Sequence, residues 1–162
     1  MSQPVPPPSG NPFADPGAAY APVPPPAPAR DNVGLGIVVA LVAALAGAAA
    51  YGALGAAIER EIGYAAIGVG ALIGFAAGKV GGRNPALPFV SGLLALPAVY
   101  LGQLIAIAAI VADLQQTAFA DIFVDRFGDL VDTWSKAADG MTYVFLVIGA
   151  VAAYGAAKKA NA

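Results

Sequence analysis

The best candidates in this chain for a metal site or for acid–base catalysis are four regularly recurring aspartates: Asp121, Asp125, Asp129 and Asp132. In a helix they would share one face, about one turn apart. Carboxylates in such a row could hold Ca²⁺ or Mg²⁺ together with water, or act as a general acid and base. A straight helix, however, lacks the looped backbone that wraps a bound cation. We therefore expect a solvated acidic face on which Asp132 pairs with Lys136, and keep a metal site as the alternative.

The residue types on which many enzymes rely are missing. The chain has no cysteine and no histidine, which removes thiol nucleophiles, imidazole bases and the commonest ligands of zinc and haem. Gly68, Gly70 and Gly74 resemble a phosphate-binding loop only by number, because they lie in an apolar run without the Lys and Ser/Thr of such a loop. An acidic balance without a basic cluster disfavours nucleic acid as a partner. We expect a protein with no enzymatic activity and no cofactor.

Gln103 is the one strongly polar side chain inside a long apolar run. It could mark a polar pathway, which would make the protein a small transporter or channel subunit with an external acidic face. Alternatively, it forms an interhelical hydrogen bond that fixes packing. We favour the packing role, because no charged side chain accompanies Gln103 within the run.

The composition is that of a membrane protein. Hydrophobic residues make up 59% of the 162 residues and charged residues only 11%, against about 25% charged in soluble domains. Residues 32–58 and 84–112 contain no charged residue at all. Stretches of this length without charge are long enough to cross a bilayer, so the lipid bilayer is the first expected partner.

The hydropathy pattern predicts an all-α integral membrane protein with four transmembrane helices, one amphipathic interfacial helix and a disordered N-terminal tail. The expected spans and segments are about 33–57, 62–78, 87–112 and 141–157 for the membrane helices, about 114–136 for the amphipathic helix, and 158–162 for a C-terminal tail. Pro97 predicts a kink or a local opening near residues 93–97.

Small residues recur every four positions along three of these spans. A helix with this pattern has a smooth face on which another helix can pack closely. The expected helix-packing residues are Gly36, Ala40, Ala44, Ala48, Gly52, Ala56, Gly70, Gly74, Gly78, Ala98, Gly102 and Ala106. We expect the first two spans to form a hairpin in which their small faces meet, and the same faces also allow a homo-oligomer.

Residues 1–32 hold eleven of the fourteen prolines, which prevents helix and sheet from propagating. Such a tail is either a semi-rigid spacer or a PxxP-type ligand for a cytoplasmic protein partner. The basic residues orient the chain, because those of the two tails and the 79–83 turn outnumber those of the other loops by five to three. This excess predicts that both termini lie in the cytoplasm of a bacterial cell.

The stretch 62–85, with Gly68, Gly70, Leu72 and Gly74 before a glycine-rich turn, resembles a loose set of uncharacterised bacterial multi-pass membrane proteins. The bias toward Ala, Gly and Pro is similar to that of actinobacterial proteins with a proline-rich N-terminus. The resemblance implies a cell membrane location and no particular activity. The sequence thus favours a non-enzymatic membrane protein, with an adaptor or assembly role for its tail, over the transporter alternative.

Overall fold

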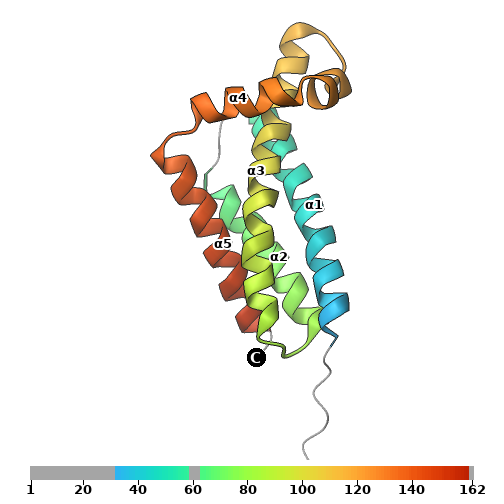
Figure 1. Ribbon diagram of the computed structural model, residues 1–162, viewed down its shortest axis with the longest axis vertical. Helices are drawn as coiled ribbons and strands as arrows, with labels where there is room; N and C mark the ends of the chain where they lie inside the picture. Colours follow the sequence, from blue (N-terminus) through green and yellow to red (C-terminus); the bar gives the residue numbers. More distant parts are fainter. Residues whose placement is uncertain (1–31, 59–62, 161–162) are drawn as a thin grey trace, which may run out of the picture.

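The computed structural model describes residues 32–58 and 63–160, and this part of the chain is helical without strands. The longest helices of this part lie side by side as a bundle of four (Figure 1). They are α1 (Val33–Ile58), α2 (Ala65–Gly81), α3 (Ala86–Gln115) and α5 (Gly140–Ala160). A short π-helical turn, η1 (Asp121–Asp125), and helix α4 (Phe127–Ala137) lie across one end of the bundle. The predicted tail 1–32 lies outside the described residues except for Asn32.

Three of the helices are long and apolar enough to cross a membrane. At 1.5 Å per residue, α1, α3 and α5 have lengths of about 39, 45 and 31 Å, against a hydrocarbon core of about 30 Å. Helix α2 is equally apolar but has 17 residues and is about 25 Å long. These three long apolar helices indicate a membrane protein.

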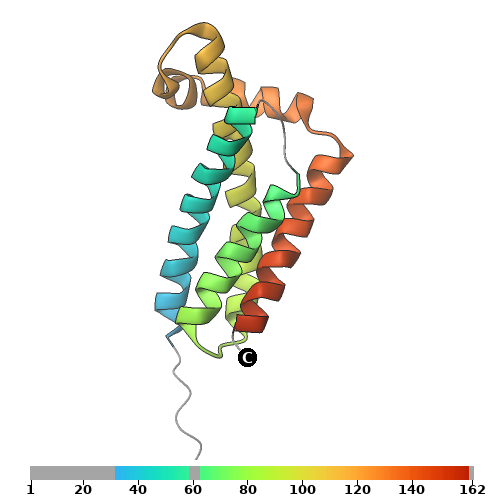
Figure 2. The same cartoon turned by 180° about the vertical axis from the view of Figure 1, so that it is seen from behind.

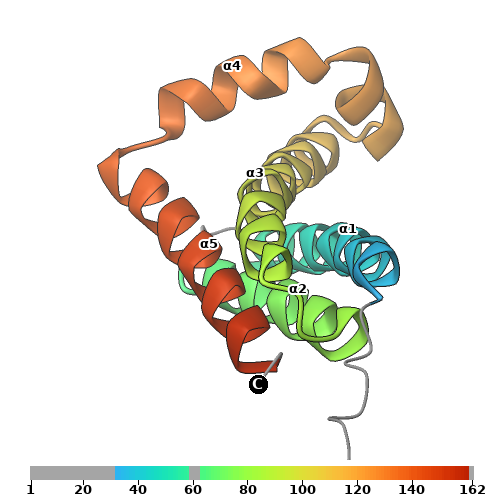
Figure 3. The ribbon, with the colours of Figure 1, turned by 60° about the horizontal axis from the view of Figure 1, so that its bottom comes forward.

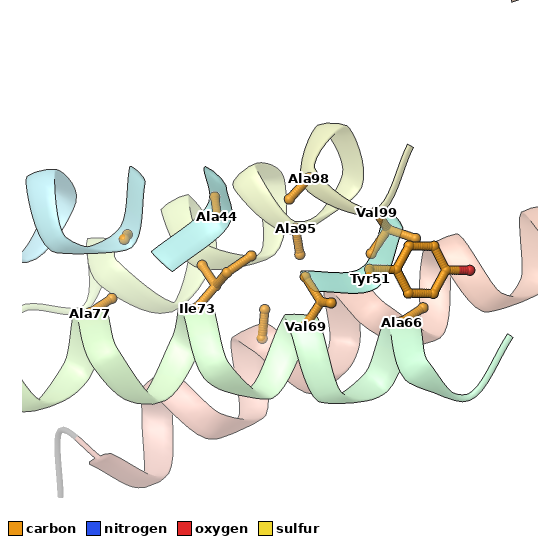
Figure 4. Packing of buried hydrophobic residues seen from close by; sticks show 11 residues of the cluster. Ala44, Tyr51, Ala66, Val69, Ile73, Ala77, Ala95, Ala98 and Val99 are labelled. Carbon is orange, nitrogen blue, oxygen red and sulfur yellow. The ribbon is translucent and has the colours of Figure 1, made fainter. Parts of the chain in front are cut away.

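Side-chain size is distributed in the opposite way from that of a water-soluble bundle. The core around Ile73 and Val99 consists largely of alanines such as Ala44 and Ala95 (Figure 4). Large aliphatic side chains lie on the outside instead, Val42 and Leu45 among them, each more than 60% exposed. An apolar exterior of this extent is stable next to lipid but not in water.

Neighbouring helices form two parallel pairs, although each pair is distant in sequence. Helices α2 and α5 run together in one direction, and α1 and α3 run together in the other (Figures 2 and 3). Between the two members of each pair the chain crosses the bundle once in the opposite direction. The most extensive helix seams, α2 with α5 and α1 with α3, are therefore not between consecutive helices.

Helices α1 and α2 pack together as the predicted hairpin, but the glycine ladder of α2 faces α5 and not the small face of α1, which corrects that part of the prediction. A Cβ atom added at Gly70 or Gly74 would collide with the carbonyl oxygen of Gly149 or Ala153, respectively. The small face of α1 is divided between two neighbours: Gly36 lies against Gly81 of α2, whereas other small residues of α1 lie against α3. Backbones approach this closely because no side chain intervenes.

The turn between α2 and α3 requires a glycine at one position. Gly82 has φ 79° and ψ −157°, a region that is essentially restricted to glycine. The Oδ1 atom of Asn84 then accepts a hydrogen bond of 2.9 Å from the backbone N–H of Ala86, at the first residue of α3. Helix α3 continues through Pro97 without a break, so the opening expected near 93–97 does not interrupt it.

The single amphipathic helix predicted over 114–136 is replaced by the last residues of α3 and two separate pieces, η1 and α4. The last turn of α3 reaches Gln115, and the chain reverses at Gln116, which has φ 52°. A second break occurs at Arg126, between η1 and α4, where φ is −117° and ψ is 29°. No glycine or proline marks either break, and the packing described below holds both pieces against α3.

Candidate functional site

The described charges are separated between the two ends of the bundle. The end crossed by α4, here called the acidic end, carries Asp113, Asp121, Asp125, Asp129, Asp132 and Asp139, with Arg126 and Lys136 beside them. The opposite end, here called the basic end, carries Lys79, Arg83, Lys158 and Lys159. Among residues 32–58 and 63–160, every acidic residue is thus at one end.

The four aspartates of the predicted row lie exposed on η1 and α4. The carboxylate of Asp132 pairs with Lys136 at 2.6 Å, as predicted for residues four apart in a helix. Asp129 pairs with Arg126 at 3.1 Å. The break at Arg126 interrupts the single helix that would align the row, and within the described ranges no three acidic side chains come together as ligands of one metal ion. The row is therefore an acidic surface with two ion pairs.

Gln103 is 5% exposed and lies beneath α4. Its side-chain oxygen accepts a hydrogen bond of 2.7 Å from the indole Nε1–H of Trp134. The Trp134 ring also makes edge-to-face contacts with Tyr100 of α3 and Tyr143 of α5, with centroid distances of 4.7 and 5.8 Å. Trp134 thus connects α4 to two helices of the bundle.

A small hydrophobic cluster continues this attachment toward the end of α3. Ile122 of η1 and Leu130 of α4 are each 3% exposed and pack with Leu104, Ala108 and Ala112 of α3. At the rim, Arg126 donates a hydrogen bond of 3.0 Å from Nη1 to the side-chain oxygen of Gln115. The acidic end is therefore held to α3 by apolar packing below and by polar contacts at its edge.

The sequence reading missed the start of α5, where Asp139 caps the helix. Its Oδ1 atom accepts hydrogen bonds from the backbone N–H of Thr142 at 2.9 Å and from the Thr142 hydroxyl at 3.1 Å. The Thr142 bonds, the backbone one foremost, hold the pKa of the Asp139 carboxyl below its usual value. An Asp followed three residues later by Thr, before an apolar run, is the signal that predicts such a cap.

The packing residues expected from the sequence fall in different surroundings. Ala40, Ala44 and Ala98 belong to the main core, and Gly52, Gly70, Gly74 and Gly102 lie at helix seams. Ala48 and Gly78 are buried as well. Ala56 and Ala106 are only partly buried. Ala56 lines a surface groove between the ends of α1 and α3, with Asp113 on its edge, which the sequence did not reveal.

No family model, curated protein or solved structure matches this chain. The acidic end combines a hydrogen-bonded aromatic cluster with an exposed row of carboxylates, and no Cys or His occurs anywhere in the sequence to act as a nucleophile or base. Chemically, this arrangement fixes α4 in place and presents negative charge to the surroundings.

Proposed function

We propose that this chain is a non-enzymatic bacterial inner-membrane protein that crosses the bilayer four times and recruits a cytoplasmic partner through its Pro-rich tail. Both termini are cytoplasmic in this proposal, and the acidic end faces the outside. The observation that carries it is the separation of charge between the two ends of an apolar bundle.

The fourth crossing is assigned to α2, although this helix is short. Helix α2 packs against α1, α3 and α5, and it connects the acidic end to the basic end. Lys79 near its C-terminal end lies 5.6 Å from the centre of the Phe75 ring, and its stem can extend to the interface. A helix packed against three membrane-crossing neighbours can stay in the bilayer even when its own length is slightly below the hydrocarbon thickness.

The direction of insertion follows from the basic end. Lysine and arginine near short loops favour the cytoplasmic side, and the described residues of this end carry four of them and no carboxylate. The acidic end then lies outside, with Trp134, Tyr143 and Tyr64 near the other membrane surface, where aromatic side chains of this kind are enriched.

The packing of Gln103 supports the structural role over the transport alternative. A solute or ion using Gln103 would have to replace the Trp134 indole at its side-chain oxygen and reach a site that is 5% exposed. Among the described residues no Asp, Glu, Lys, Arg or His lies in the interior of the spans, so a polar pathway would lack the groups that such proteins use. An assembly role places the partner contact in the tail instead.

Cysteine labelling tests the orientation. The chain has no cysteine of its own, so single replacements can be read without background. The outer layer of the cells is made permeable while the inner membrane stays intact, and a membrane-impermeant maleimide is added. This reagent should label Ala137→Cys, at an exposed position of α4. Ser9→Cys should react only after the cells are lysed. Labelling in the reverse order would show that the orientation is inverted.

Recruitment by the tail is tested separately with the full chain. The wild-type protein and a variant whose residues 1–32 are scrambled at equal composition should be purified from membranes under the same conditions. The proposal expects a cytoplasmic protein to co-purify with the wild-type chain and not with the scrambled variant. Identical co-purified proteins would show that the tail is only a spacer.

A further inference from the structure

A surface groove of about 330 Å³ lies between the C-terminal ends of α1 and α3, at the acidic end. Its volume is at the lower limit of ligand pockets, which is about 300 Å³. The lining consists of Ala56, Ala57, Ala109, Ile110, Asp113 and Leu114. The lining side chains are therefore aliphatic, apart from the single carboxylate of Asp113.

Small residues create this space. One turn before the groove, α1 and α3 touch so closely that a Cβ added at Gly52 would lie 2.9 Å from the carbonyl oxygen of Gly102. Beyond this contact three of the six lining residues are alanines, Ala56, Ala57 and Ala109, whose methyl groups fill little of the space between the helices. The result is an open groove between the two helix ends.

The depth of the groove in a bilayer follows from the sequence. Asp113 is the first charged residue after the uncharged run 84–112 and lies in the last turn of α3. The uncharged run is about 43 Å long, close to the roughly 40–45 Å of a bilayer with its headgroup regions, so Asp113 belongs at the headgroup level and Ala109 about one turn closer to the hydrocarbon. A molecule that fits both the alanine-lined region and the Asp113 carboxylate has an aliphatic chain and a polar group at the headgroup level.

Charge decides which polar group fits. The ion pairs among the described residues are formed by Asp129 and Asp132, and neither involves Asp113. No cation of the described residues is therefore paired with the Asp113 carboxylate. Both helices that line the groove end here, and helix C-termini carry partial negative charge. An anionic headgroup would be repelled by this surface, whereas a primary ammonium can donate hydrogen bonds to the carboxylate.

We propose that the groove binds a phospholipid with a primary ammonium headgroup, whose acyl chain lies over the alanines and whose nitrogen contacts Asp113. The proposal requires that α1 and α3 lie in a bilayer. It does not depend on the orientation or on the tail partner, so either proposal can fail without the other.

The test uses the purified full chain in detergent, titrated with phosphatidylethanolamine, phosphatidylcholine or phosphatidylglycerol of equal chain length. Native mass spectrometry then counts the lipids retained. We expect the ethanolamine lipid to be retained best, because choline has no N–H to donate and glycerol leaves the headgroup anionic. Equal retention of the three lipids would overturn the proposal.

Matched variants locate the site. Asp113→Asn should reduce the preference for the ethanolamine lipid about fivefold, the factor for one exposed charge pair of ~1 kcal/mol. Asp125→Asn makes the same change on η1, outside the groove, and should leave the preference unchanged. A preference that persists in Asp113→Asn would contradict the assignment.

A second pair of variants tests the apolar part. Ala57→Leu fills the groove from the exposed side of α1, and Ala109→Leu fills it from α3; each should lower retention of the ethanolamine lipid. Fluorescence of Trp134, the only tryptophan, reports whether the acidic end stays folded. Undiminished retention in folded Ala57→Leu protein would also overturn the proposal.

Discussion

The indole nitrogen of Trp134 donates a 2.7 Å hydrogen bond to the side-chain oxygen of Gln103, across 31 residues of sequence. This bond connects α4, which lies across the end of the bundle, to a buried position in α3. Gln103, the candidate for a polar transport pathway, thereby positions the acidic end instead. Losing this contact should loosen α4 without unfolding the helices below it.

Replacing Gln103 by Leu tests this attachment. The variant keeps the side-chain size but removes the acceptor, so the Trp134 N–H loses this partner, at a cost of about 1 kcal/mol. Acrylamide should then quench the fluorescence of Trp134 more strongly in reconstituted protein. Gln115→Leu removes an exposed acceptor instead and serves as the control. Equal quenching in both variants and the wild type would mean that packing alone holds α4.

The seam between α2 and α5 gives a comparison between two glycines of one helix. Gly74→Ala places a methyl group against the carbonyl oxygen of Ala153, and overpacking of this kind costs about 1–3 kcal/mol. Gly68→Ala meets nothing within 4 Å and should be neutral or slightly stabilising, since alanine favours a helix. Unfolding in SDS, followed by circular dichroism, measures both. Similar unfolding midpoints for the two variants would contradict the close packing of Gly74 against Ala153.

The sequence predicted the helices and the packing of α1 with α2, but not which small faces meet, for a physical reason. Long uncharged runs require helices in lipid, and four-residue spacing brings Asp132 to Lys136 within one helix. Which small faces meet is not encoded by their spacing. The glycines of α2 could equally face α1, and only the assembled bundle places Gly74 against Ala153.

The division of the amphipathic segment was hidden for a related reason. The chain reverses at Gln116, in a left-handed conformation that glycine or asparagine would usually signal. Contacts with α3, such as those of Ile122 and Trp134, hold the two pieces in place. Local residue preferences therefore gave no sign of the break, because tertiary packing determines it.

The turn after α2 depends on one backbone conformation. Gly82→Ala places a Cβ in a region of positive φ and extended ψ, where the strain costs about 1–3 kcal/mol. Gly128→Ala, in α4, has open space around its Cβ position and is the matched control. The thermal midpoint should fall for Gly82→Ala and stay near that of the wild type for Gly128→Ala. Unchanged stability in Gly82→Ala would show that the turn can adopt another conformation.

The cap of α5 should make the start of this helix sensitive to acid. Because the Thr142 bonds lower the pKa of Asp139 in the folded chain, the carboxylate stabilises the helix start at pH values above its usual pKa of about 3.9. The contribution is lost as pH falls through the lower folded pKa. Hydrogen exchange at the Thr142 amide, corrected for the intrinsic rate, should therefore lose protection in that acidic range.

Two substitutions separate the charge of Asp139 from its hydrogen bond. Asp139→Asn keeps an oxygen that can accept from the Thr142 N–H, so some protection should remain, and it should no longer change with acid. Asp139→Ala removes the acceptor and should reduce protection of Thr142 at every pH. Asp125→Asn, which alters an exposed carboxylate elsewhere at the acidic end, should keep the wild-type pH dependence. A pH step that persists in Asp139→Asn would assign the acid sensitivity to another group.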